Sequence, residues 1–196
     1  MTLDLGPATT TLATLVAAVR DEDLARPTPC TEYSVADLVD HVGGLAVAFT
    51  GAARKEPVPG TEQGAVGDGP RLEPGFRDRI GADLGALAAA WRDPAAYDGM
   101  TAAGGIDLPG DVAAAVALNE VVVHGWDLAT ALGRPFEVTD ADVAACLSFA
   151  RPFSPPRRPS PSAAPPSARP SRSRPEPRPC SSCSPSSAAA PERGSP

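Results

Sequence analysis

Apolar residues recur at helical spacing in four long segments of this chain, and no segment alternates between apolar and polar residues over the length of a strand. The first segment spans 7–20, and the others span about 35–53, 71–92 and 109–132. One apolar face repeated over segments of 14 to 24 residues is typical of amphipathic helices that pack around a shared core. The sequence therefore predicts an all-α fold, a four-helix bundle.

Short local signals predict where several of these helices begin and end. Ser34 is a hydroxyl residue at the expected start of the second helix. Asp107 and Pro109 are expected to cap and open the fourth helix, and Gly133 to end it. Thr139 has the character of a cap for a short fifth helix that ends near residue 151.

The composition changes abruptly after Phe153. From 154 to 196 there is no Val, Ile, Leu, Met, Phe, Tyr or Trp, and 25 of the 43 residues are Pro or Ser. Without large apolar side chains nothing offsets the conformational entropy lost on folding. We predict a folded domain over 1–153 and a disordered tail over 154–196.

Charge follows the same division. The tail has seven Arg and two Glu, whereas residues 1–153 carry 10 basic and 22 acidic side chains. An acidic domain argues against nucleic-acid binding, which needs clustered Lys and Arg. Because no early apolar run reaches the ~18 residues that cross a membrane, we expect a cytoplasmic protein with no membrane partner.

Glu120 and His124 are the strongest candidates for chemistry. They are four residues apart on a predicted helix, so their side chains lie on one face, one turn apart. A carboxylate and an imidazole placed in this way can share one divalent metal ion. The only other histidine, His41, lies on the apolar face of the second helix and would supply a third ligand.

Purely structural roles are the alternatives for the residues at and around this candidate site. Taken alone, His41 is also consistent with a ring that hydrogen-bonds to a backbone carbonyl, or with one that lies exposed at the edge of the apolar helix face. Asp127 is a candidate acceptor for the N–H of a metal-binding imidazole, and such a hydrogen bond would fix the tautomer of the ring. A carboxylate that faces solvent is the alternative. Trp126 is more typical of core packing than of a substrate contact.

No other catalytic arrangement is present in the sequence, so we expect no catalytic residue beyond the metal ligands. There is no G-x-S-x-G motif and no Gly-rich phosphate loop with its lysine. Cys30 precedes the second helix without an evident base. Cys180 and Cys183 have C-x-x-C spacing but fall in the predicted tail, where no redox or zinc role is expected.

Two longer motifs resemble those of a known family. They are Pro27-Thr-Pro-Cys-Thr-Glu-Tyr-Ser-Val-Ala-Asp-Leu-Val-Asp-His41 and Glu120-Val-Val-Val-His-Gly-Trp-Asp127. The chain resembles the DinB/YfiT-like metalloenzymes, in particular the metal-binding domain of mycothiol-dependent maleylpyruvate isomerases and its stand-alone actinobacterial relatives. The resemblance covers about 1–153 and implies a four-helix bundle that holds a divalent metal, commonly zinc, through His41, Glu120 and His124.

Relatives use the metal with a low-molecular-weight thiol, mycothiol or bacillithiol, for isomerisation or transfer. The resemblance therefore implies an enzyme whose partners are a small-molecule thiol and a substrate. A metal-binding sensor or binding module without catalysis is the alternative, and a structural bundle in which His41 packs apart from Glu120 is a third hypothesis. The sequence leaves the oligomeric state open.

The chain departs from the family after the fifth helix, where similar chains continue with an apolar segment. Here the sequence turns to Pro, Ser, Arg and Ala at Ser154. We hypothesise that 154–196 is an out-of-frame translation. Translating the gene in the other two frames tests this, and the absence of an apolar C-terminus in both would reject it.

Overall fold

The computed structural model of this chain describes residues 2–56, 58–61 and 64–153. It contains five α-helices: α1 (Gly6–Ala17), α2 (Val35–Arg54), α3 (Phe76–Ala90), α4 (Gly110–Leu132) and α5 (Asp140–Ala150). Two short strands, β1 (Met100–Ala103) and β2 (Ile106–Pro109), lie between α3 and α4. The predicted tail, with Cys180 and Cys183 and the proposed frame error, lies outside the described residues.

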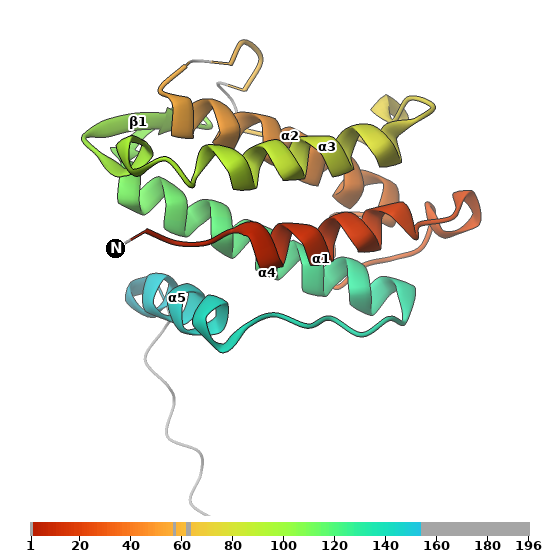
Figure 1. Cartoon of the computed structure of the whole chain (residues 1–196). Helices are drawn as coiled ribbons and strands as arrows, with labels where there is room; N and C mark the ends of the chain where they lie inside the picture. The colour runs from red at the N-terminus through yellow and green to blue at the C-terminus, as the bar shows by residue number, and fades with distance from the viewer. Residues whose placement is uncertain (1, 57, 62–63, 154–196) are drawn as a thin grey trace, which may run out of the picture. The chain divides into compact units, whose positions relative to one another are not determined.

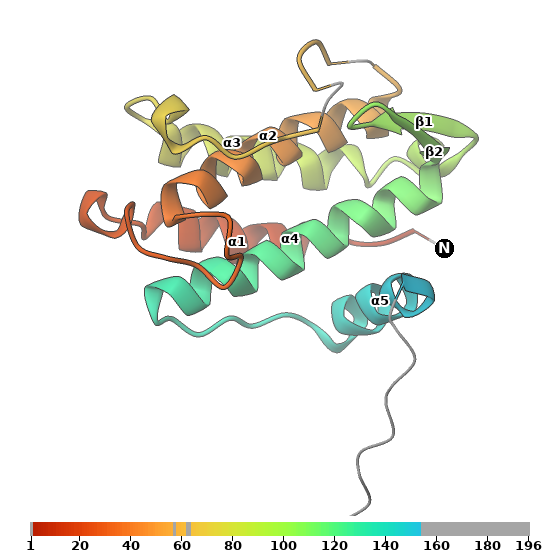
Figure 2. The same cartoon turned by 180° about the vertical axis from the view of Figure 1, so that it is seen from behind.

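The four longer helices surround a common core. α3 packs against α1 and α2, and α4 also packs against α1 and α2, as the two opposite views show (Figures 1 and 2). α5 contacts α4 on the side away from α2 and α3 (Figure 1). This connectivity brings α2 and α4, which are far apart in the sequence, side by side.

The core is apolar and draws on all four longer helices. Its most enclosed large side chains are Trp91, Leu5, Leu12, Leu38, Ile80, Leu84, Leu87, Leu118, Leu128, Val16, Val35 and Val39. Small side chains, chiefly alanine, fill the rest of the buried face of α4. Alanine gives α4 high helix propensity and lets its backbone approach α1 and α2 closely.

The predicted helix signals are confirmed at both capping boxes. The Ser34 hydroxyl accepts a hydrogen bond from the Asp37 amide, while the Asp37 carboxylate accepts one from the Ser34 amide. Thr139 and Asp142 make the same reciprocal pair at the start of α5. Gly133 ends α4 with a φ of 65°, in the left-handed region that glycine adopts readily.

The β-hairpin between α3 and α4 corrects the prediction of an all-α fold. Met100 pairs with Pro109 and Ala103 with Ile106 in an antiparallel register, and Gly104 and Gly105 form the turn at positive φ. Two adjacent residues with positive φ are the signature of a tight hairpin turn. Asp107 and Pro109 therefore belong to β2 rather than to the first turn of the helix, and α4 begins at Gly110.

Glycines on α2 allow neighbouring segments to approach this helix closely, whereas the glycines on α3 do not have this role. A Cβ on Gly44 would lie 2.8 Å from the Cβ of Ala65 in the α2–α3 connection, and a Cβ on Gly43 would lie 3.1 Å from Ile80. Nothing lies within 4 Å of an added Cβ at Gly81 or Gly85 on α3. Gly81 and Gly85 therefore do not serve the close approach of a neighbouring helix.

Two helices in the described part of the chain are long and apolar enough to cross a membrane by length and composition alone. They are α2 and α4, and about half of each apolar window, 56% and 50% respectively, is buried inside the protein. Helices that contribute to a soluble core have the same property. The resemblance to a spanning segment is therefore weak evidence for a membrane location.

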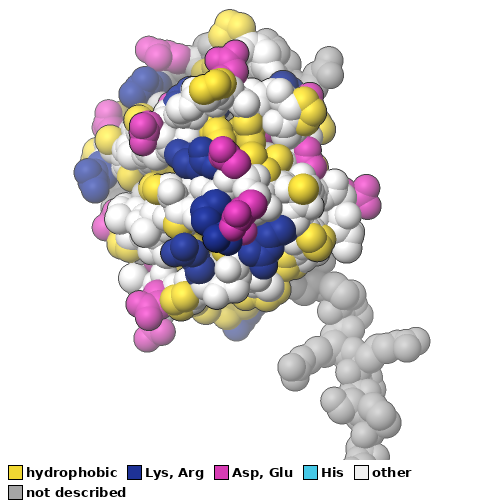
Figure 3. Space-filling model, turned by 90° about the vertical axis from the view of Figure 1, so that its right-hand side faces the viewer, with side chains coloured by type: hydrophobic (Ala, Val, Ile, Leu, Met, Phe, Trp, Pro, Cys, Tyr) yellow, Lys and Arg dark blue, Asp and Glu magenta, His cyan; other side chains and the backbone are white. Residues whose placement is uncertain are grey.

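The connection between α1 and α2 is fixed by a buried carboxylate. Asp23 accepts hydrogen bonds from the Arg20 backbone and side chain and from Arg26 at distances of 3.0–3.1 Å. Figure 3 faces this end of the molecule and shows arginine and carboxylate side chains next to each other on the surface. The hydrogen bonds from Arg20 hold the pKa of Asp23 well below its ordinary value.

Candidate metal centre

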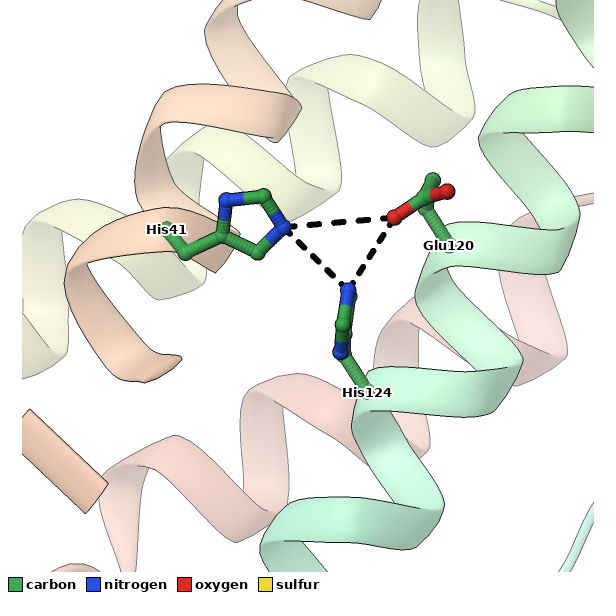
Figure 4. A group of neighbouring side chains, drawn as sticks. All are labelled: His41, Glu120 and His124. Atoms are coloured by element: carbon green, nitrogen blue, oxygen red, sulfur yellow. Dashed lines mark hydrogen bonds and ion pairs between the residues drawn. The ribbon is translucent and has the colours of Figure 1, made fainter. Parts of the chain in front are cut away.

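The packing of α2 against α4 brings three chemically matched side chains together. His41 extends from α2, while Glu120 and His124 extend from successive turns of α4, and all three point toward one another (Figure 4). They form the only group of three or more His, Cys, Asp or Glu side chains with metal-binding spacing among the described residues. Their role as metal ligands stays a prediction.

The atoms that face one another are one nitrogen from each imidazole and one carboxylate oxygen. His124 Nε2 is 3.1 Å from Glu120 Oε2, and the two Nε2 atoms are 3.2 Å apart. His41 Nε2 is 3.9 Å from the same Glu120 oxygen. A single cation at roughly 2 Å from all three atoms fits this triangle, and Zn–N and Zn–O bonds are about 2.0–2.2 Å long.

Each imidazole is held on its outer side by an acceptor. His41 Nδ1 contacts the backbone carbonyl oxygen of Ala65, and His124 Nδ1 lies 3.2 Å from Asp127 Oδ2. Asp127 is buried, so the solvent-facing alternative for this carboxylate is wrong. The backbone-carbonyl alternative for His41 is right for Nδ1, while Nε2 of the same ring faces Glu120 and His124.

These outer contacts decide which nitrogens carry hydrogen. A carbonyl or carboxylate oxygen can only accept, so both Nδ1 atoms are donors. In the neutral rings both Nε2 atoms then bear lone pairs, which point at each other and at the Glu120 carboxylate. Three acceptor atoms so close together repel one another unless a proton or a metal cation lies between them.

The two histidines differ in their affinity for a proton. Burial lowers the pKa of His41 below its ordinary value, and the nearby charge of His124 adds to this effect. Burial also opposes a charge on His124, but the hydrogen bonds and negative charges of Glu120 and Asp127 outweigh it and raise its pKa. His124 therefore binds a proton more readily than His41 does.

The site opens to solvent on the side of Glu120. The Glu120 side chain is 29% exposed, against 13% for each histidine. On its inner side Glu120 borders an apolar cavity of about 10 Å³ between the four helices, room for about one water molecule. A ligand larger than water must therefore approach from the surface.

Trp126 and Val123 lie on the exposed side of α4. Their side chains are 53% and 44% exposed, so the prediction that Trp126 packs in the core is wrong. The next residue along from His124, Gly125, serves packing instead. A Cβ there would lie 2.5 Å from the Phe136 ring, so the glycine admits this ring against α4.

Two neighbours of His41 are absent from the predicted site. The first is the Ala65 carbonyl, which belongs to the Gly- and Pro-rich connection in which the sequence shows no specific chemistry. The second is Tyr33, whose ring lies 5.3 Å from the His41 ring between centroids. Tyr33 is marked in the sequence by its place in the first family-like motif, whereas a backbone carbonyl has no residue type to identify it.

Comparison with known proteins bears on this geometry. Residues 5–129, which include all three candidate ligands and Asp127, match the family described as "Mycothiol maleylpyruvate isomerase N-terminal domain". Two curated proteins of Mycobacterium tuberculosis, "Uncharacterized protein MT0763" of strain CDC 1551 and "Uncharacterized protein Rv0738" of strain H37Rv, are 34% identical over 135 residues. The match covers 66% of this chain and 64%, less than two thirds, of each relative. No solved structure matches the chain.

Proposed function

Because the chain belongs to the family of mycothiol maleylpyruvate isomerase N-terminal domains, we propose that it is a zinc-dependent enzyme that uses a low-molecular-weight thiol. His41, Glu120 and His124 hold the metal in this proposal, and Asp127 orients His124. The thiol is mycothiol, and the reaction is a transfer or an isomerisation. We further propose that α1 to α4 form a four-helix bundle of the DinB/YfiT type and that the protein is cytoplasmic.

One observation carries the proposal of a metal site. His41 Nε2, His124 Nε2 and a Glu120 oxygen converge within 3.9 Å, while both Nδ1 atoms are occupied by outer acceptors. A bland structural pair of histidines would have at least one ring turned to donate Nε2–H to a neutral acceptor. Convergence of three lone pairs supports a cation between them.

The donor set favours zinc over harder cations. Two imidazoles and one carboxylate are common zinc ligands, and a site with three protein ligands leaves a fourth position open. Calcium and magnesium prefer oxygen ligands, of which this site offers one residue. A zinc ion in such a site stabilises a thiolate or lowers the pKa of bound water.

The residues of the chain support thiol chemistry in two ways. The exposed side of Glu120 leaves an approach from solvent, and the closed apolar core behind it excludes bulk water from the inner side. Asp127 keeps the His124 ring oriented toward the site.

Metal content of the purified protein tests the first part of this proposal. We expect one zinc per chain in the wild type and loss of stoichiometric zinc in His124→Ala, with most helicity retained. Glu120→Gln should lose zinc as well, whereas Glu137→Gln, an exposed carboxylate outside the site, should keep it. Unchanged metal content in His124→Ala would remove this residue from the site.

Turnover tests the second part. The zinc-loaded protein is incubated with mycothiol and an electrophile, with and without a chelator, and consumption of the thiol is followed. Chelator-sensitive turnover that His124→Ala abolishes supports the enzyme. Stoichiometric zinc without turnover would instead favour the metal-binding sensor or binding module.

A further inference from the structure

We propose that the segment Ala65–Gly69 in the α2–α3 connection acts as a clamp that holds the His41 ring with Nε2 facing Glu120 and His124. Its consequence for metal affinity rests on the proposed function. The orientation of the ring is a property of the protein alone. Ala65 and Gly44 are positioning residues in this proposal, because neither one reaches the three converging atoms.

The clamp acts through the Ala65 backbone carbonyl. This oxygen contacts His41 Nδ1, and since a carbonyl only accepts, it fixes the hydrogen on Nδ1. The opposite nitrogen is then left with the lone pair that faces His124 Nε2 at 3.2 Å. Without this acceptor the neutral ring prefers neither tautomer strongly and is free to turn about its side-chain bonds.

Glycines hold the segment tightly against α2. A Cβ on Gly44 would lie 2.8 Å from the Ala65 Cβ, so only glycine at 44 allows the Ala65 backbone to come this close to the helix. A Cβ on Gly69 would lie 2.6 Å from the Cβ of Ala36, and one on Gly67 would collide with the Asp37 carbonyl oxygen. Residues 65, 67 and 69 of the segment therefore all lie close against the N-terminal half of α2.

Polar contacts tie the same segment at successive residues. The Gly67 amide donates to Tyr33 Oη at 3.1 Å, the Asp68 amide to Asp40 Oδ2 at 3.0 Å, and the Gly69 amide to Asp37 Oδ1 at 2.8 Å. Arg71 binds Asp40 as well and donates to the Val66 carbonyl. Three successive amides bound by side chains of fixed elements leave the carbonyl of Ala65 little freedom to move.

Gly44→Ala is the variant that tests the clamp. The new Cβ must displace Ala65, while Gly43→Ala, the matched control on the same helix, meets only the side chains of Ile80 and Arg79. The double variant Gly44→Ala/Ala65→Gly removes the Cβ of residue 65, with which the new Cβ at residue 44 would collide. It should let the segment Ala65–Gly69 lie against α2 as in the wild type. Circular dichroism of all three variants establishes that the helices remain.

The primary readout is the tautomer of His41 in the metal-free full chain, measured through two-bond ¹H–¹⁵N correlations of the imidazoles. The chain has two histidines, which keeps the spectrum simple. In the wild type and in Gly43→Ala we expect His41 with hydrogen on Nδ1. In Gly44→Ala we expect a mixture of tautomers, and in the double variant a return to the wild-type state.

The second readout is the zinc dissociation constant, measured by competition with a chromophoric chelator. Loss of an outer hydrogen-bond partner of a histidine ligand weakens metal binding about 10–100-fold, so we expect at least a tenfold increase in Gly44→Ala and recovery in the double variant. Tyr33→Phe keeps the ring beside His41 and removes only the acceptor of Gly67, and should give a smaller increase of the same sign.

The outcomes separate the clamp from the proposed function. If the wild type binds zinc and Gly44→Ala matches it in both tautomer and affinity, the clamp is overturned while the metal site stands. If the wild type binds no zinc but Gly44→Ala still shifts the tautomer, the clamp on the ring stands and the proposed function falls. Failure of the double variant to recover would also overturn the assignment to the Gly44–Ala65 contact.

Discussion

Asp127 combines burial, negative charge and a contact with a candidate metal ligand. Its carboxylate lies 3.2 Å from His124 Nδ1 and is 8% exposed. An ionised acceptor in this position raises the electron density of the ring and fixes its tautomer. Asp127 therefore has a stronger hold on His124 than a backbone carbonyl would have.

We predict that Asp127→Asn weakens zinc binding about 10–100-fold, because the amide keeps the shape of the side chain and loses its charge. Asp111→Asn, an exposed carboxylate in the first turn of the same helix, is the control and should leave the dissociation constant unchanged. Chelator competition measures both. Equal affinity in the two variants would show that Asp127 only packs beneath the ring.

A pH dependence of stability is expected from Asp23, far from the metal centre. Its pKa is lowered by the hydrogen bonds from Arg20, against about 3.9 in an unfolded chain. The stabilisation is therefore fully present above the unfolded value and is lost as the pH falls toward the folded pKa. The free energy of unfolding, measured with urea, should be larger for the wild type than for Asp23→Asn at pH 7. The difference between the two proteins should shrink between pH 5 and pH 2. Asp98→Asn, an exposed control, should show a small difference at every pH.

At the scale of single residues, the sequence indicated the candidate ligands but not all of their supports. His41, Glu120 and His124 are polar types on apolar helix faces, which singles them out, whereas Asp127 was a candidate only through its place just beyond His124. The Ala65 carbonyl was not predictable, because any residue offers the same oxygen. It depends on where the connection folds, and that depends on contacts at Gly44 between segments about 20 residues apart.

Helix α3 is the element that its own sequence supports least. Gly81 and Gly85 lie in its interior, where nothing lies within 4 Å of an added Cβ. Glycine in such a position costs backbone entropy without gaining a close contact. The amphipathic pattern of Phe76, Ile80, Leu84 and Leu87, all buried, is what stabilises the helix instead.

We predict that Gly81→Ala and Gly85→Ala each raise the free energy of unfolding by about 0.5–1 kcal/mol. Gly75→Ala is the contrasting control: Gly75 precedes the helix at a φ of 85°, and alanine there should destabilise by about 1–2 kcal/mol. Urea denaturation of the three variants measures this. A destabilising Gly85→Ala would mean that an unseen contact occupies the exposed face of α3.

Elements of different length were predictable to different degrees. The five helices follow from periodicity and caps, since long amphipathic segments repeat their signal over several turns. The hairpin was missed because strands of four residues carry too few alternations to register, and because Gly104-Gly105 also fits a loop. The start of α4 was expected at Pro109 with Asp107 as its cap, and it lies at Gly110 because residues 106–109 pair with β1.

At the scale of the whole molecule, every buried core residue in the described part of the chain lies between Leu5 and Ala131. We predict that a chain ending at Phe153 unfolds cooperatively, within about 0.5 kcal/mol of the full chain, which is the scale of changes at the surface. It should also bind the same amount of zinc. Thermal unfolding followed by circular dichroism, with metal analysis, measures both properties. A large loss of stability would place residues 154–196 in the fold and reject the predicted domain boundary.

His41 and His124 are separated by 83 positions along the chain. During synthesis, therefore, the first imidazole leaves the ribosome long before the helix that carries the other two groups exists. A nascent chain shorter than 120 residues has only one of the three candidate donors. If the centre binds a metal ion as proposed, uptake requires closure of this long loop, so occupancy of the centre would report that α2 and α4 have packed together in a given copy.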